Sequence, residues 1–437
     1  MRSTLSRLWK DRRGNFGMLF ALTAVPLVAA GGLSVDFARA LSTQNDLKAQ
    51  ADTAALGVLA PNSETVAAAM GMSGDGTVAI GSDAMARLVK AQQGDEKPSD
   101  LSSSATTFQG TVTKKGRTLS ANITFTQEVP TTLLAIIGQN DLVVSGQSTA
   151  VLQTQSFMDF YMLLDNTPSM GVGATPADVA KLVNATSDKC AFACHIVKDG
   201  VEDPNSYYNL ARKIGATIRI DVVAKATAAL MDEAKAQMQF ANQFRIAAYT
   251  FGEKAEDVKL QKVASLTSNF TAAKKKTDAI KLMSIPYNGY NGDQQTSFDD
   301  ALTKISSEID TPGTGASISD REKILFFVAD GVGDSYKPST CTKRTTGGRC
   351  QEPIDTTYCQ KLKDRGIRIA VLYTTYLPLP TNDWYNTWIK PFQSEISTRM
   401  QTCASPGLFF EVSPTQGIAD AMKALFYRVI ESPHLTN

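Results

Sequence analysis

Two segments decide the fold: FYMLLDNTPS at residues 160–169 and KILFFVADG at residues 323–331. Each contains a short apolar run that ends in an aspartate, Asp165 in the first and Asp330 in the second. Apolar runs of this length are typical of strands that are buried on both faces of a parallel sheet. Since the carboxyl ends of such strands meet at one edge of the sheet, we expect both aspartates to lie there.

The sequence around these segments alternates apolar runs with amphipathic ones. This predicts an α/β domain over residues 157–437, with a doubly wound, mostly parallel sheet flanked by helices on both faces. We predict strands at residues 157–165, 243–252, 321–330 and 366–374. We predict helices at residues 217–238, 296–309, 357–365 and 417–430.

Two hydroxyl side chains follow the first aspartate. Thr167 and Ser169 lie two and four residues after Asp165, and a tight turn there can aim all three oxygens at one point. Oxygen ligands with few carboxylates suit a hard cation, which we expect to be Mg²⁺, with Mn²⁺ and Ca²⁺ as alternatives. Taken singly, each of these residues is better explained as a helix cap, and Asp330 as a turn residue.

The string Asp165-x-Thr167-x-Ser169 resembles Asp-x-Ser-x-Ser, the first motif of the metal-ion-dependent adhesion site of von Willebrand factor A (VWA) domains. The resemblance covers about residues 157–431, and threonine replaces the first serine. It implies that Thr296, in a Gly-rich loop before a helix, and Asp330 complete the site. It further implies a VWA-type fold that binds a protein partner, whose acidic side chain completes the metal shell.

The amino-terminal residues predict a membrane anchor. A basic flank, residues 1–14, precedes an uncharged run at residues 15–34 that is long enough to span a bilayer. The positive-inside rule leaves the flank in the cytoplasm and sends the rest of the chain across the membrane. A signal peptide cleaved near residues 28–30 is the alternative.

The first sixty residues resemble the amino-terminal region of Tad-type (Flp) pilus-assembly proteins of the TadG class. The resemblance rests on the basic-Arg-Gly entry, on Val35, Asp36 and Arg39, and on the Ala-Asp-x-Ala-Ala-Leu helix at residues 51–56. No glutamate follows Gly14 closely, so we do not expect prepilin processing. The resemblance implies a single-pass protein of the bacterial inner membrane. Its VWA domain would be periplasmic or exported to the cell surface, with partners in the pilus apparatus or on the cell surface.

Between the anchor and the α/β domain, the sequence predicts two further regions. Residues 35–104 form a helical extension and linker, with one short helix at 82–93 and otherwise loop or weakly ordered structure from about residue 61. Residues 105–156 alternate Thr and Val and predict a small antiparallel β region with a brief helix near 129–139. A long helix followed by such a sheet has a pilin-like outline, by analogy only.

The six cysteines all lie in the second half of the chain and favour disulfides in an oxidising compartment, with free thiols as the alternative. Their spacing leaves fifteen pairings open. The TadG resemblance implies the pair Cys359 and Cys403. We expect Cys190 with Cys194, and Cys341 with Cys350, to be local links within loops.

Composition restricts the classes of function. Lys and Arg number 44 and Asp and Glu 43, which argues against nucleic acid as a partner. With two histidines, and with neither a GxSxG nor a Walker motif, we expect no enzyme. The alternatives are a metal-free VWA scaffold or spacer, and an envelope hydrolase that uses the same metal. An aromatic cluster at residues 376–392 predicts either an interface anchor or a cover for the sheet edge.

Overall fold

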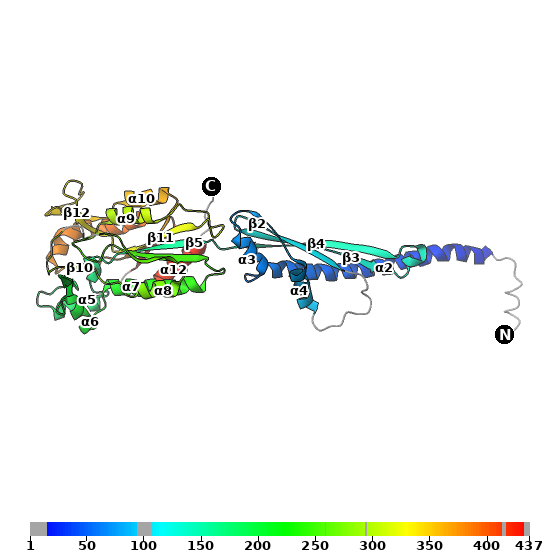
Figure 1. Ribbon diagram of the computed structural model, residues 1–437, viewed down its shortest axis with the longest axis horizontal. Coiled ribbons are helices and arrows are strands. Elements are labelled where there is room, and N and C mark those ends of the chain that lie inside the picture. Colours follow the sequence, from blue (N-terminus) through cyan, green and yellow to red (C-terminus); the bar gives the residue numbers. More distant parts are fainter. Residues whose placement is uncertain (1–14, 94–105, 258, 293–294, 413–416, 432–437) are drawn as a thin grey trace. The chain divides into compact units, whose positions relative to one another are not determined.

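The computed structural model describes residues 15–93, 106–257, 259–292, 295–412 and 417–431. The chain divides into two compact units, Met1–Thr154 and Gln155–Asn437 (Figure 1). Buried apolar side chains form two core clusters in the second unit, and the first unit has buried apolar side chains of its own. The predicted cytoplasmic flank, residues 1–14, lies outside the described residues, and so does the end of the predicted linker, residues 94–104.

The first unit is a four-stranded antiparallel sheet packed against a long helix. Its strands follow one another in chain order: β1 (Gly76–Ala79), β2 (Thr107–Lys115), β3 (Thr118–Pro130) and β4 (Asp141–Gln153). Its helices are α2 (Asn15–Val58), α3 (Glu64–Gly71), α4 (Ser82–Gln93) and the short η1 (Leu134–Ile137). The alternation of Thr and Val in the sequence is that of a sheet with one face on the core, as predicted.

Residues 61–81 differ from the prediction. We expected loop or weak order, whereas the structure has α3 and the edge strand β1 there. Ser63 caps α3 by accepting a hydrogen bond from the Val66 backbone N–H, and β1 pairs with β2. The pairing of β1 depends on residues more than thirty positions away, so the Gly-rich sequence carries little local sign of it.

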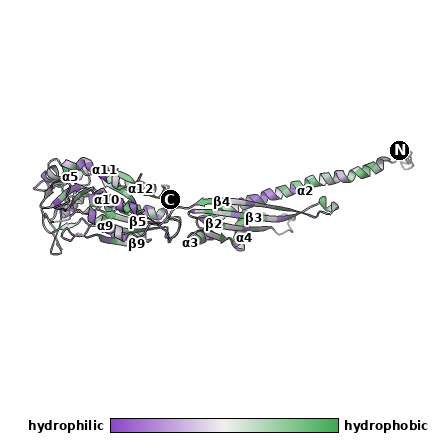
Figure 2. Ribbon diagram, turned by 90° about the horizontal axis from the view of Figure 1, so that it is seen from above, coloured by the Kyte–Doolittle hydropathy of each residue, from purple (hydrophilic) through white to green (hydrophobic). Residues whose placement is uncertain are grey.

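Apolar residues of α2 pack on the sheet in its carboxy-terminal half, where Leu47, Ala51, Ala54 and Ala55 are buried. Toward its amino-terminal end apolar residues predominate (Figure 2). In the part of the chain that the structure describes, no helix combines the length and apolar character needed to cross a membrane. The span predicted at residues 15–34 therefore stays a prediction.

Asp36 fastens α2 to the connection between β3 and β4. Its carboxylate accepts hydrogen bonds from the backbone N–H groups of three successive residues, Thr132, Leu133 and Leu134, at 2.8 to 3.0 Å. One turn further along the helix, Arg39 donates to the Thr132 hydroxyl at 2.7 Å. Asp36 thus satisfies the free N–H groups at the start of η1, and Arg39 holds the Thr132 side chain beside them.

The second unit is built on a six-stranded sheet in the order β16-β15-β11-β5-β8-β9. Every strand is parallel to its neighbour except the edge strand β9, which is antiparallel to β8. The strands are β5 (Met158–Leu164), β8 (Phe244–Thr250), β9 (Gln261–Thr267), β11 (Glu322–Ala329), β15 (Arg368–Thr374) and β16 (Phe409–Val412). The predicted mostly parallel sheet is confirmed, and β9 and β16 were not predicted.

Helices cover both faces of this sheet (Figure 1). One face carries α7 (Arg219–Ala236), α8 (Phe270–Thr277) and α12 (Ile418–Glu431), and the other carries α9 (Phe298–Glu308), α10 (Thr356–Asp364) and α11 (Gln393–Cys403). Alternate residues of β5 enter the two cores: Phe160 and Met162 face one, and Tyr161 and Leu163 the other. Full burial of each such side chain stabilises the fold by roughly 1.5–3 kcal/mol.

Insertions lie between these elements. Their elements are η2 (Pro168–Gly171), α5 (Pro176–Ala185), β6 (His195–Lys198), β7 (Val201–Glu202), α6 (Tyr207–Lys213), β10 (Ser284–Ile285), β12 (Val332–Tyr336), β13 (Thr345–Thr346), β14 (Arg349–Pro353), η3 (Tyr385–Ile389) and η4 (Lys390–Phe392). In the predicted aromatic cluster, Tyr385 and Phe392 are buried in the core, and Trp384 lines a cavity described below. Part of the cluster is therefore core and part lines a cavity, and both interpretations stay predictions.

Two of the three expected disulfides are present. Cys359 in α10 is bonded to Cys403 at the end of α11, and Cys341 is bonded to Cys350 in β14. The expected link between Cys190 and Cys194 is wrong, because both are free thiols. The chain between them pairs with another segment, through a bridge of Phe192 with Val172, and so does not curl into the loop that such a bond needs.

A thiol count tests this pairing. We expect the full chain, oxidised and then denatured without reductant, to show two reactive thiols per molecule, because Cys190 and Cys194 are the free pair. Reduction before denaturation should raise the count to all six cysteines. A reading of zero thiols in the unreduced sample would mean that these two residues are also bonded.

A buried ion cluster occupies the amino-terminal end of β5. Asp159 is fully buried and accepts two hydrogen bonds from Arg245, both at 2.7 Å, and one from Lys323 at 2.6 Å. Burial raises the pKa of Asp159, but these two cationic donors outweigh it and leave the pKa below its usual value. Ionised Asp159 is therefore part of the folded structure.

We expect Asp159→Asn to lower the free energy of unfolding of the full chain by about 3 kcal/mol, since it leaves buried cations without their counter-ion. Urea denaturation followed by circular dichroism measures this. Asp232→Asn is the matched control, because Asp232 pairs with Lys274 on the exposed side of α7. It should change the same quantity by less than about 1 kcal/mol. Equal losses in the two variants would contradict this account.

Candidate metal site

The strand order places the site. From β5 the chain continues to β8 on one side, whereas β11 and β15 lie on the other, so the order reverses between β5 and β11. In open α/β sheets, ligands bind outside the carboxyl ends of the strands at such a switch point. Asp165 follows β5 and Asp330 follows β11, and the Asp165 backbone N–H donates to Val328 O at 2.9 Å.

The turn after β5 brings three polar side chains together. Asp165 Oδ1 accepts hydrogen bonds from the Thr167 backbone N–H at 2.9 Å and from the Thr167 hydroxyl at 2.7 Å. Thr167 Oγ1 lies 3.4 Å from Ser169 Oγ. Pro168 begins the short helix η2, and its fixed φ favours this geometry. The carboxylate and both hydroxyls therefore share one small volume, with Asp165 and Thr167 fully buried.

Asp330 is held from two directions. Its Oδ1 accepts a hydrogen bond from the Val332 backbone N–H at 3.2 Å, and its Oδ2 lies 3.2 Å from Nη1 of Arg219. The turn requires Gly331, whose φ is +73° and whose added Cβ would lie 2.7 Å from the Ile396 side chain. Ser169 also hydrogen-bonds Asp330, and Thr167 lies between it and Asp165.

Arg219 is the residue that the sequence reasoning missed. It is the first residue of α7, and its side chain is only 2% exposed. It also lies over the Tyr376 ring, with Cζ 5.0 Å from the ring centroid. A signal was present in the sequence, since Arg219 stands between Ile218 and Ile220 at the start of an apolar helix face. A charge at such a position needs a buried partner.

The two aspartates are electrostatically strained. Burial, and then the neighbouring charge of Asp330, raise the pKa of Asp165 to about 7, although Thr167 and Arg219 act in the opposite direction. Burial also raises the pKa of Asp330, against the lowering effect of Arg219. Among the described residues, Asp165 Oδ2 has no hydrogen-bond partner. A buried oxygen of this kind is costly unless a cation or donor satisfies it.

Thr296 lies across a small cavity from the turn. Its backbone pairs with that of Asp334 in both directions, at 2.8 and 2.9 Å, just before α9 begins. Thr296 and Ser169 both line a cavity of about 300 Å³, together with the aromatic side chains of Tyr290, Tyr376 and Trp384. The two aspartates do not line it. The structure thus brings Asp165, Thr167, Ser169 and Asp330 together and places Thr296 on the cavity beside them.

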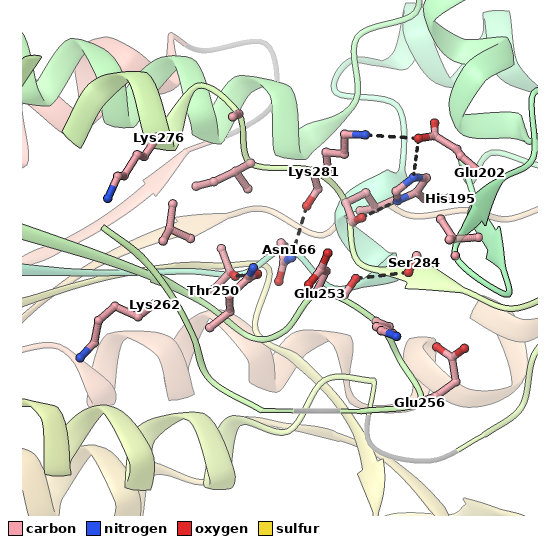
Figure 3. A pocket seen from close by; sticks show the side chains of 18 of the residues that line it. Asn166, His195, Glu202, Thr250, Glu253, Glu256, Lys262, Lys276, Lys281 and Ser284 are labelled. Atoms are coloured by element: carbon pink, nitrogen blue, oxygen red, sulfur yellow. Dashed lines mark hydrogen bonds and ion pairs between the residues drawn. The ribbon is translucent and has the colours of Figure 1, made fainter. Parts of the chain in front are cut away.

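Asn166 lines a larger cavity of about 910 Å³ (Figure 3). Asn166 is buried and donates to Gly252 O at 2.7 Å. His195 lines this larger cavity, with Nδ1 2.7 Å from Leu282 O and Nε2 3.6 Å from Glu202 Oε2. In the described part of the chain, no histidine lines the cavity of Ser169, and His434 lies outside that part.

The donor set fits a hard divalent cation. It offers the free Oδ2 of Asp165 and the hydroxyls of Thr167 and Ser169, with Asp330 and Thr296 close by. Within the described residues, one group of at least three His, Cys, Asp or Glu ligands lies close enough to hold a metal: Cys341, Cys350 and Glu352. Its sulfurs are joined in a disulfide, so they are not thiolate ligands.

No protein-family model matches the sequence, and no curated protein matches it. Matched solved structures include the vWF domain of the type V pili tip protein Mfa5 from Porphyromonas gingivalis, with 9% identity and a TM-score of 0.33 over 65% of this chain and 99% of that one. A point mutant of the PilB minor pilin from Streptococcus sanguinis has 11% identity and a TM-score of 0.35, over 77% and 82%. The adhesive tip pilin GBS104 from Group B Streptococcus agalactiae has 11% and 0.34, over 74% and 68%. Values this low leave the function to be argued from the site itself.

The raised pKa of Asp165 predicts a pH effect in the absence of divalent ions. Between about pH 4 and pH 7 the folded protein keeps a proton on this carboxyl that the unfolded chain has released. This proton stabilises the fold, and its contribution is lost as pH rises through that window. In chelator, we expect Asp165 to lower the free energy of unfolding by about 1.4 kcal/mol per pH unit over the window.

Urea titrations of the wild type and Asp165→Asn at pH 5, 6, 7 and 8 measure this contribution. The asparagine cannot titrate, so the stability of the variant relative to the wild type should rise with pH up to about 7 and then level off. A difference that stays constant across this pH range would show that Asp165 is ionised throughout.

Proposed function

We propose that the second unit is a VWA-type binding domain that holds a divalent cation and, through it, a protein partner. The observation that carries the proposal is the buried Asp165, whose unpartnered Oδ2 lies in a turn with the Thr167 and Ser169 hydroxyls at the switch point of the sheet. We expect the ion to be Mg²⁺, with Mn²⁺ and Ca²⁺ as alternatives.

Each residue has a role in this proposal. Asp165, Thr167 and Ser169 hold the ion, and Thr296 and Asp330 act directly or through water. The ion supplies a positive charge to which a carboxylate of the partner binds. The cavity beside Ser169 and Thr296 is where that carboxylate enters, and its aromatic walls fit apolar groups next to it.

The proposal includes a place in the cell envelope. Two disulfides fit an oxidising compartment outside the cytoplasm. Large apolar side chains near the start of α2, such as Met18, Phe20 and Leu22, are exposed, which supports a hydrophobic anchor at residues 15–34. In this hypothesis the protein belongs to the Tad/Flp pilus machinery and exposes its VWA-type domain in the periplasm or at the cell surface.

A metal-free scaffold is the second candidate, and the ion pair of Arg219 with Asp330 favours it. The guanidinium already neutralises one of the two buried carboxylates without any added cation. In that case the domain would bind its partners, or act as a spacer, through its surface alone. Direct titration with a metal ion separates the two candidates.

We expect Mn²⁺ to bind the full chain with one site per molecule, as measured by calorimetry in acetate-containing buffer at pH 7.5. Asp165→Ala should abolish this binding, because it removes the carboxylate around which the hydroxyls gather. Asp232→Asn, which removes an exposed carboxylate of α7, should bind Mn²⁺ like the wild type.

Circular dichroism confirms that Asp165→Ala is folded before its binding is compared. Mn²⁺ should also raise the melting temperature of the wild type and not that of Asp165→Ala, since a ligand that binds only the folded state stabilises it. Wild-type protein that binds no Mn²⁺ would favour the metal-free scaffold. Equal binding by Asp165→Ala would place the ion elsewhere.

A further inference from the structure

The charges at the candidate site do not sum to the value that a divalent ion would balance. Once ionised, Asp165 and Asp330 contribute two negative charges, and Arg219 contributes one positive charge. All three side chains are buried, at 0%, 0% and 2% exposure. Their sum is −1, so a divalent ion bound among them would leave an excess charge of +1 in a place from which water is largely excluded.

An unbalanced buried charge is expensive. Taking an ion out of water costs several kcal/mol unless an opposite charge compensates it at short distance. A carboxylate arriving from the small cavity would supply that compensation and bring the sum to zero. Without Arg219, the divalent ion alone would bring it to zero.

Three contacts hold the Arg219 side chain in place beside Asp330. Its Nη1 lies 3.2 Å from Asp330 Oδ2, its Nη2 donates to Thr375 O at 3.5 Å, and its guanidinium lies over the Tyr376 ring. Its Nε has no hydrogen-bond partner among the residues described. At least one of the five N–H donors of this guanidinium is therefore unused, and the ion pair with Asp330 is its main compensation.

We infer that Arg219 couples the two ligands of the site: it weakens binding of the cation alone and makes that binding depend on a carboxylate. The inference rests on the proposed function and adds the rule by which the site would work. By linkage, the cation must tighten carboxylate binding by the same factor by which the carboxylate tightens cation binding. The cation and an acidic partner would thus be taken up together.

The test is Mn²⁺ calorimetry on the full chain, with acetate as the carboxylate probe and chloride at matched ionic strength as the reference. We expect acetate to tighten Mn²⁺ binding by the wild type at least fivefold, within the usual range of coupling between two sites. Arg219→Met should bind Mn²⁺ in chloride at least tenfold more tightly than the wild type. Acetate should give it no further gain, because the charge sum is already zero.

Two further variants keep the test interpretable. Arg219→Lys retains the positive charge, so the acetate effect should persist. Arg321→Met is the matched control, because Arg321 is another buried arginine, 3.5 Å from the buried Asp159 at the opposite end of β5. It should lose stability without any change in Mn²⁺ affinity or in the acetate effect.

Stability gives a second readout. Arg219→Met leaves Asp330 buried without its counter-ion, so we expect a lower melting temperature in chelator than for the wild type. Mn²⁺ in chloride should then raise the melting temperature of Arg219→Met by more than it raises that of the wild type. Arg321→Met should show the loss in chelator without the larger recovery.

The outcomes separate the inference from the function on which it rests. Tight Mn²⁺ binding by the wild type in chloride, equal affinity in Arg219→Met, or an acetate effect that persists in Arg219→Met would overturn the inference and leave the metal site standing. Absence of Mn²⁺ binding in both the wild type with acetate and Arg219→Met would overturn both.

Discussion

The burial of two carboxylates at the ends of adjacent strands, β5 and β11, is the constraint on which the rest of the second unit depends. Aspartates are rarely fully buried without partners, and two close together repel one another. The negative charge of the two carboxylates is partly compensated by the Thr167 donors, the Val332 backbone N–H and the Arg219 guanidinium. One carboxylate oxygen, Oδ2 of Asp165, is still left without a partner among the described residues. The described residues therefore neutralise the negative charge of these two carboxylates only in part.

The central strands were predictable because a strand buried on both faces is a continuous apolar run. The helices over them were predictable because each has one apolar face. β5 and β11 are continuous apolar runs, and α12 has a clear apolar face. The edge strand β9 was not predictable, because half of its residues face solvent and its pairing with β8 includes a register shift. The insertion strand β12 likewise depends on its pairing with β14, which lies more than ten residues later, and a short polar strand shows little of this in the sequence.

From the sequence we predicted that the carboxyl ends of two strands would meet at the site, but not which residues of other elements would lie beside them. Asp165, Thr167 and Ser169 could be placed because they lie within five residues on one turn, and Asp330 because strand order brings it alongside. Arg219 begins a helix fifty residues after Ser169, so no spacing rule connects it with the aspartates. Thr296 reaches the cavity by a backbone pairing with Asp334 that has no local signature. The pairing of Cys190 with Cys194 failed for a related reason, since their nearness in sequence is undone by the bridge of the intervening chain to Val172.

In the first unit, Asp36 accepts hydrogen bonds from three successive backbone N–H groups, and this has a mechanical consequence. A single carboxylate that meets three donors fixes both the axial position and the rotation of α2, because sliding by one residue or turning by 100° would break all three bonds at once. Tension applied along α2 from its amino-terminal end would therefore pass at Asp36 into the β3–β4 connection and from there into two thirteen-residue strands paired along their length. The load would then be divided between the backbone of α2 and these two strands, instead of being carried by the helix alone.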